Sequence, residues 1–201
     1  GDVAKFAGDA MIVLWPTSAD APLALSTARA AACAMDLQAS LGRIEVLPGV
    51  GLSFRAAVSA GSLAMGYLGG VQGRWEAILL GEALADLGPA VAQCRPGEVV
   101  VTPQALVGIG DLAKGSPLYS GCTRLETMPG VYPPDSPGEV ALPPNLGPHL
   151  LALLPSPVAA RLGEGEMAWV AELRQLSILF VNLPGVSHET PIESAQAIIR
   201  A

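Results

Sequence analysis

The stretch Lys5-Phe6-Ala7-Gly8-Asp9-Ala10, followed by Met11-Ile12-Val13-Leu14-Trp15, decides how this chain is interpreted. Two apolar, strand-like segments flank a Gly-Asp pair, a pattern typical of a β-hairpin with an acidic residue at its tip. Such a turn fixes the aspartate backbone and points its carboxylate outward, where it can bind a hard cation such as Mg²⁺. From the spacing alone, a Gly-Asp turn without any chemistry is the simpler interpretation.

Composition restricts the class of protein. Of the 201 residues, 51% are hydrophobic and 14% are charged, so the chain can bury a substantial core. The net charge of −7, with scattered basic residues, argues against nucleic acid or an anionic membrane as partner. No apolar run approaches the roughly 18 residues of a membrane span. The three cysteines, Cys33, Cys94 and Cys122, are widely spaced and predict no disulfide framework, which fits a reducing cytoplasm.

Strand and helix patterns alternate along the first half of the chain and predict an α+β or α/β sandwich. We expect a helix to about residue 41, a strand over 52–61 and a glycine-rich turn over 66–70. A further strand follows over 75–81. The next helix, over 82–93, is expected to be interrupted at Gly88-Pro89, because proline removes a helical hydrogen bond. A last short strand over 97–102 leads into a helix that begins at Pro103.

The amino-acid composition changes after residue 114, where prolines become frequent. We expect irregular structure over 115–148, and short helical pieces over 149–162 and 166–172. A buried-strand pattern then returns at 176–183, and a helix begins at Ile192.

Several motifs resemble those of one family. The run Gly1-Asp2-Val3-Ala4-Lys5-Phe6-Ala7-Gly8-Asp9-Ala10 resembles the second metal-binding motif of class III nucleotidyl cyclases, in the form found in the first catalytic half of the bicarbonate-responsive soluble adenylyl cyclases. Residues 55–61 with 66–69, and residues 78–84, are similar to two later segments of that half. Residues 172–183 resemble the opening strand of the second half.

The resemblance implies an α+β, ferredoxin-like catalytic domain that is truncated at its N-terminus. The first half would occupy residues 1–114, a proline-rich linker residues 115–171, and the start of the second half residues 172–201. It also implies an adenylate cyclase, a phosphorus–oxygen lyase that converts ATP to 3′,5′-cyclic AMP and pyrophosphate in intracellular signalling. The complete site would lie between the two halves of the same chain and use two Mg²⁺ or Mn²⁺ ions.

Site residues follow from the same resemblance. Asp9 matches the second metal-binding aspartate, and the first is expected on a strand upstream of Gly1. Asn182 stands where a metal-binding half carries aspartate, so the second half is not expected to bind metal. Arg55 matches a basic residue that contacts the ATP phosphates. From the residues alone, the favoured interpretation of Arg55 is an exposed strand residue that pairs with a local acid.

A regulatory anion pocket is implied as well. Lys5 matches the lysine that binds bicarbonate in the family, and Leu79 the residue whose backbone lines that pocket. A lysine within an apolar strand is costly without an anionic partner, which favours a functional or ion-paired Lys5. Gly88 stands where the family has the arginine that completes the pocket, so bicarbonate responsiveness is doubtful.

These expectations leave two classes of function open. The chain as given is expected to be inactive, because the complete site needs the first aspartate and most of the second half. The alternative is a non-catalytic cyclase homologue that regulates a partner or binds nucleotide without turnover. A guanylyl cyclase is a third possibility, since the residues that select the base lie mainly in the second half.

Overall fold

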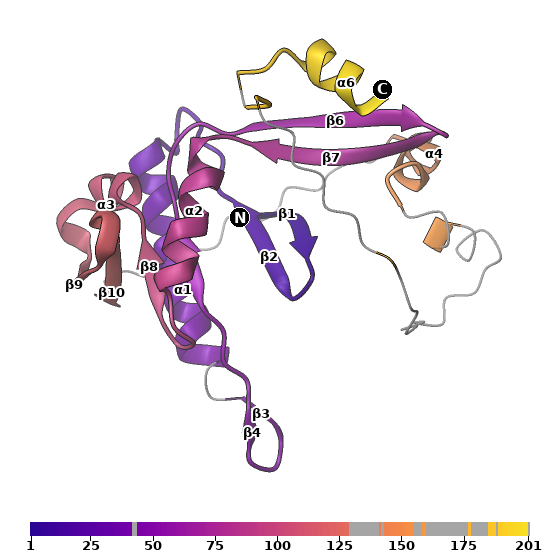
Figure 1. Ribbon diagram of the computed structural model, residues 1–201. Helices are drawn as coiled ribbons and strands as arrows, with labels where there is room; N and C mark the ends of the chain where they lie inside the picture. The colour runs from indigo at the N-terminus through magenta and orange to yellow at the C-terminus, as the bar shows by residue number, and fades with distance from the viewer. Residues whose placement is uncertain are drawn as a thin grey trace. The chain divides into compact units, whose positions relative to one another are not determined.

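A computed structural model describes residues 1–41, 44–128, 141, 143–154, 158–159, 177, 185–187 and 189–200. The contacts divide the chain into two compact units, residues 1–63 with 81–135 and residues 64–80 with 136–201. Each unit is described by itself (Figure 1).

The first unit combines a four-stranded sheet, two short hairpins and three α-helices. Its elements are β1 (Asp2–Ala7), β2 (Ala10–Leu14), α1 (Leu23–Leu41), β3 (Glu45–Leu47), β4 (Val50–Gly51), β5 (Ala56–Val58), α2 (Glu82–Gln93), β8 (Val99–Val101), α3 (Pro103–Ile109), β9 (Lys114–Pro117) and β10 (Thr123–Thr127), with single 3₁₀ turns at Gly110–Leu112 and Tyr119–Gly121. The sheet has the order β5-β8-β10-β9, while β1 pairs with β2 and β3 with β4. β5 is parallel to β8 and the other pairs are antiparallel. The sheet is therefore mixed, and the expected α+β class is confirmed.

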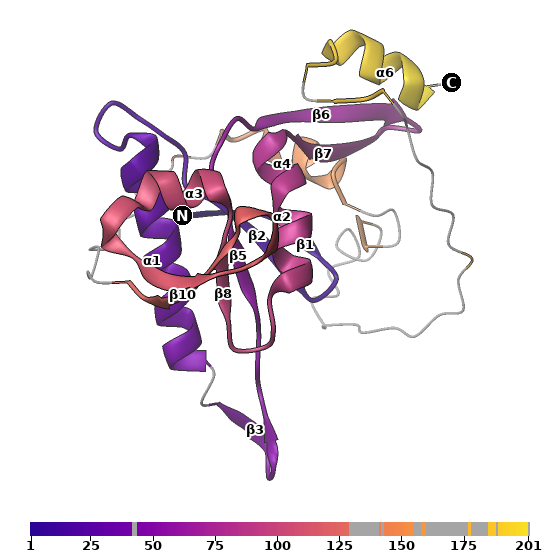
Figure 2. The same ribbon diagram turned by 60° about the vertical axis from the view of Figure 1, so that its left-hand side comes forward.

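The core lies on both faces of β8, because successive side chains of a strand point to opposite faces. Val99 and Val101 pack with alanines of α1, with α3 and with Leu125 of β10. Val100 points to the other face and packs with Ala90 of α2 and with two buried cysteines, Cys94 and Cys122. Figure 2 shows α1 and α2 running along these strands.

The second unit is built around one long hairpin. It contains β6 (Ala64–Val71), β7 (Arg74–Leu80), α4 (Leu146–Leu151) and α6 (Ile192–Arg200). β6 and β7 pair antiparallel, with a register shift between Gly69 and Val71. In Figures 1 and 2, α6 lies alongside β6.

The structure corrects three expectations about local structure. Residues 66–70 form the middle of strand β6 rather than a turn, and the turn comes after Val71. Helix α2 continues through Gly88 and Pro89 without interruption. Proline costs a helix about 3 kcal/mol in its interior, but the next residue, Ala90, is fully buried and packs with Cys94 and Val100.

The third correction concerns the segment after residue 114. Instead of irregular structure, β9 and β10 complete the four-stranded sheet, and β10 pairs directly with β8. The boundary expected at residue 114 therefore falls within a strand. The expected strand over 176–183, the residue Asn182 and the helical piece over 166–172 lie outside the described residues, apart from Ser177.

Candidate functional site: a hairpin tip and a cleft between strand edges

Asp9 lies at the tip of the β1–β2 hairpin, as the sequence predicts. The pair Ala7–Ala10 closes the hairpin, and Gly8 and Asp9 form its two-residue turn. Gly8 has a φ of 64°, which suits a turn with glycine at its first central position. Asp9 is exposed, so its carboxylate is available to a cation or a partner.

A cleft of about 730 Å³ lies in the same unit. Two runs of strand and post-strand residues, 12–17 and 57–63, form two of its walls. Helices α1 and α2 close it with short or apolar side chains: Leu23, Ser26, Thr27, Ala30, Ala83, Leu84 and Leu87. The cleft thus lies between β2 and β5, with a helix on either side.

The strand edges that face this cleft carry no strand partner among the described residues. On β5, the Ala56 amide donates to the Glu98 carbonyl oxygen at 3.1 Å, and the Val58 carbonyl accepts from the Thr102 amide at 3.0 Å. In a parallel pair, alternate residues bond to the same neighbour, so the backbone groups of Ala57 and Ser59 point to the opposite edge. That edge lines the cleft, where its backbone groups face the open space.

Arg55 immediately precedes β5 and is exposed. Its Nη1 atom donates to the Cys94 carbonyl oxygen at 3.3 Å. Asp9 and Arg55 belong to the same unit, but they form no ion pair with each other within the described part of the chain. Among the described residues, the acceptor of the Arg55 guanidinium is this backbone carbonyl, and no acid pairs with Arg55 there.

Two titratable groups lie near Arg55. Burial raises the pKa of the Cys94 thiol, whose Sγ donates to the Glu98 carbonyl oxygen at 3.2 Å. The pKa of the Glu98 carboxyl is lowered, first by the Arg95 amide that donates to it at 3.0 Å and then by the Arg124 guanidinium at 3.2 Å. Neither of these groups lines the cleft.

The residues expected in the anion pocket fall in different units. Lys5 is half-buried on β1 of the first unit. Leu79 is half-buried on β7 of the second unit, where it pairs with Met65 of β6. Gly88 is exposed on α2, and a Cβ atom added there would meet nothing within 4 Å. The pocket itself stays a prediction.

Neither a metal cluster nor a membrane helix is found in the described ranges. No three His, Cys, Asp or Glu side chains among the described residues come together in a way that could hold a metal ion. Asp9 alone is one ligand, and a single carboxylate does not make a magnesium site. None of the described helices combines the length and the apolarity needed to cross a bilayer.

Comparisons with known proteins give only a weak likeness to solved structures. No protein-family model matches the chain. No curated protein matches it either. Among solved structures, it is similar to the crystal structure of the guanylate cyclase domain of RhGC from Catenaria anguillulae in complex with GTP. The TM-score is 0.42 and the identity 15%, over 52% of this chain and 61% of that one. A likeness this low supports no assignment of family, substrate or mechanism.

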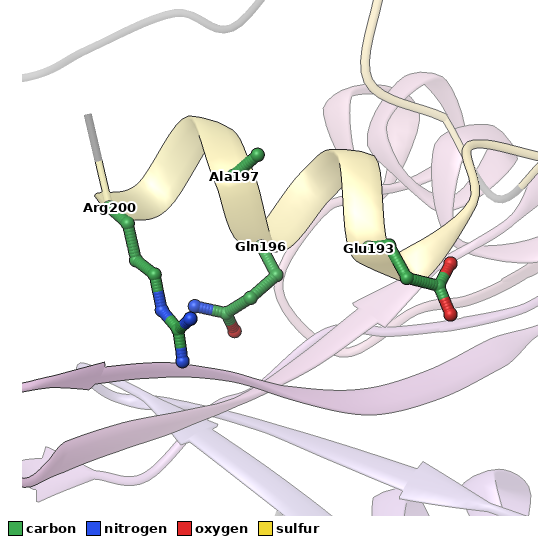
Figure 3. A pocket seen from close by; sticks show the side chains of 4 residues that line it. All are labelled: Glu193, Gln196, Ala197 and Arg200. Atoms are coloured by element: carbon green, nitrogen blue, oxygen red, sulfur yellow. The ribbon is translucent and has the colours of Figure 1, made fainter.

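One interacting residue escaped the sequence analysis. Gln196 of α6 lies in a surface hollow of about 550 Å³ together with Glu193, Ala197 and Arg200. Figure 3 shows Gln196 and Arg200 pointing toward the strands, while Ala197 points away from them. The only sequence signal was the apolar spacing around it, with Ile192, Ala195 and Ile199 on one side of the helix.

Proposed function

We propose that the chain is part of a class III nucleotidyl cyclase of the adenylyl type, whose complete form converts ATP to cyclic AMP and pyrophosphate. The observation that carries the proposal is the hairpin formed by the motif around Lys5–Ala10, with Asp9 exposed at its tip. Because a two-residue turn holds the backbone, the carboxylate is presented without a large loss of entropy on binding a cation.

The cleft between β2 and β5 supports the proposal. The site needs a second acidic residue, which we assign to a strand N-terminal to Gly1 in the complete protein. An extended strand in the cleft would pair with the free backbone groups of Ala57 and Ser59 on one side and with β2 on the other. It would then run beside the hairpin that carries Asp9.

Bound Mg²⁺ or Mn²⁺ would supply activation of the ribose 3′-hydroxyl and neutralisation of phosphate charge. In this chain, Asp9 would be one metal ligand. Arg55 would exchange its bond to the Cys94 carbonyl for a charge-assisted bond to a phosphate oxygen, which is stronger. The second half of the same chain would complete the site, and the present 201 residues alone would be inactive.

Regulation by bicarbonate is expected to be absent. Lys5 would supply a charge, but Gly88 offers no guanidinium to bind the anion in a forked geometry.

The decisive experiment measures cyclic AMP and cyclic GMP production by the full-length protein with Mn²⁺ and either ATP or GTP. We expect cyclic AMP from the wild type and at least a hundredfold loss in Asp9→Asn, a change of about 2.7 kcal/mol or more in activation free energy. Asp20→Asn, another exposed aspartate of the same unit, is the control and should retain activity.

Each other outcome has a defined meaning. Production of cyclic GMP alone would change the substrate to GTP. A folded wild type without either product would refute the cyclase proposal in favour of a regulatory module. Activity that survives in Asp9→Asn would remove Asp9 from the metal site. Added bicarbonate should leave the rate unchanged.

A further inference from the structure

Hydrogen bonds hold the backbone on both sides of Arg55 to the segment just before β8. The Phe54 carbonyl oxygen accepts from the Gly97 amide at 2.7 Å, and the Ala56 amide donates to the Glu98 carbonyl oxygen at 3.1 Å. The peptide groups before and after Arg55 are therefore both bonded to the same short segment. Because a side chain leaves an extended backbone in a set direction, these bonds fix where the Arg55 side chain begins.

The side chain of Gln38, on helix α1, joins these bonds. Its Nε2 atom donates to the Phe54 carbonyl oxygen at 2.8 Å and to the Glu98 carbonyl oxygen at 3.1 Å. A side-chain amide has two N–H donors, so one nitrogen can bond to both acceptors at once. Gln38 thus connects the residue before Arg55, and the acceptor of the Ala56 amide, to helix α1. We call these two bonds the Gln38 brace.

The helix that carries Gln38 is itself held by the core. Ala34, about one turn earlier on α1, is buried and belongs to the same core cluster as Val58 of β5. Gln38 is half-buried, and burial strengthens a hydrogen bond because less water competes for its partners. The brace therefore connects the backbone at Arg55 to a well-packed part of the first unit.

The two carbonyl oxygens are satisfied even without Gln38. Each of them accepts a backbone amide, and the Glu98 carbonyl oxygen also accepts from Sγ of Cys94 at 3.2 Å. A buried acceptor without a partner would lower stability, but removing the Gln38 donors leaves neither carbonyl without one. The brace is thus an additional restraint on this backbone, and it can be removed without creating an unsatisfied buried group.

We propose that Gln38 is a positioning residue for the contact between Arg55 and the nucleotide phosphates. The inference rests on the proposed function, which assigns that contact to Arg55. The Arg55 guanidinium is exposed and donates to the Cys94 carbonyl oxygen at 3.3 Å, so it has to leave this acceptor to reach a phosphate. By holding the backbone still during that movement, the brace keeps the guanidinium within reach of one phosphate position and reduces the entropy lost on binding.

Gln38→Met tests the brace in the full-length protein. Methionine keeps the length of the side chain and removes both donors. With Mn²⁺ and ATP we expect kcat/KM to fall about tenfold, because small displacements of a substrate-positioning group lower the rate by one to two orders of magnitude. The control is Gln104→Met, at an exposed position of α3, which should leave kcat/KM unchanged. Gln38→Glu, which also lacks the two donors, takes the place of Gln38→Met if methionine prevents folding.

A double-mutant cycle with Arg55→Ala separates positioning from a general loss of structure. If Gln38 acts through Arg55, then Gln38→Met should change kcat/KM by less than about twofold once Arg55 is replaced by alanine. An equal loss in both backgrounds would overturn the inference, because Gln38 would then act on the fold and not on Arg55. Full activity of Gln38→Met in the wild-type background would overturn it as well.

Binding of inorganic pyrophosphate distinguishes a failure of this inference from a failure of the proposed function. A wild type that makes no cyclic nucleotide refutes the proposed function, and titration calorimetry with pyrophosphate and Mn²⁺ then tests the role of Gln38 by itself. Binding that is about tenfold weaker in Gln38→Met than in the wild type supports the inference. Equal affinity of the two proteins, or no binding to either, overturns it.

Discussion

The four-stranded sheet of the first unit and the β6–β7 hairpin of the second are stabilised in opposite ways. In the sheet, β8 is fully covered, and Val99, Val100 and Val101 are each at most 1% exposed. In the hairpin, β6 carries glycines at positions 66, 69 and 70, and its Met65 and Tyr67 side chains remain more than half exposed. Buried side chains stabilise the sheet. In the hairpin, glycines of β6 leave space for α6 to approach the strand backbone and bond to it.

This difference teaches how the two regions respond to change. Removing atoms from the sheet leaves a cavity, whereas adding atoms to β6 displaces α6 or strains the backbone. The hairpin should therefore depend on its partner helix, while the sheet should depend on its own core.

The largest effect is expected in the core. Ile109 is 2% exposed at the end of α3, and Ile109→Ala should lower the free energy of unfolding by about 2–5 kcal/mol. Val107 of the same helix is 83% exposed, so Val107→Ala should change it by less than about 0.5 kcal/mol. Urea unfolding monitored by circular dichroism measures both. Equal losses in the two variants would contradict the core assignment.

A smaller effect is expected on the hairpin. Gly69→Ala forces a side chain onto a positive φ and against the Arg74 carbonyl, at a cost of about 1–3 kcal/mol. Hydrogen exchange should show the amides of β6 and β7 opening more often, with the sheet of the first unit unchanged. Gly88→Ala is the control, because its Cβ points into open space within a helix, and it should stabilise α2 by up to about 1 kcal/mol. Unchanged protection of β6 in Gly69→Ala would show that the hairpin tolerates added atoms and would contradict this comparison.

The smallest effect is electrostatic and belongs to the sheet. The lowered pKa of Glu98 means that its carboxylate is favoured in the folded state. Its contribution is present above the ordinary glutamate pKa of about 4.3, and is lost as the pH falls through the folded pKa. The wild type should be more stable than Glu98→Gln at pH 7, and the two should converge in acid. A difference that is constant from pH 7 to pH 3 would contradict this.

The elements predicted correctly are those encoded by short-range chemistry. A Gly-Asp pair between apolar segments placed Asp9 at a hairpin tip, and Thr102-Pro103 marked the start of α3, where the Thr102 hydroxyl accepts from the Ala105 amide at 3.3 Å. These patterns depend on backbone preferences of a few neighbouring residues. Long-range contacts have little influence on them.

The elements predicted wrongly are those decided by distant partners. The glycines of β6 favour a turn in isolation, yet pairing with β7 and docking of α6 make them a strand. Pro89 favours a break, yet packing of Ala90 and Cys94 against the sheet keeps α2 continuous. β9 and β10 are short and follow a glycine- and proline-rich pattern, and only their pairing with β8 defines them.

The sequence by itself determined the hairpin with Asp9 at its tip, the apolar strand of valines and an alternation of strands and helices that fits an α+β or an α/β class, because these follow from local turn chemistry and hydrophobic periodicity. Only the tertiary structure decided that β2 and β5 both line one cleft, and that Gln196 forms hydrogen bonds with Gly69 across 127 residues of sequence. The physical reason is that a long-range hydrogen bond or an unpaired strand edge depends on which segments lie side by side in the fold. Local sequence patterns do not determine which distant segments become neighbours.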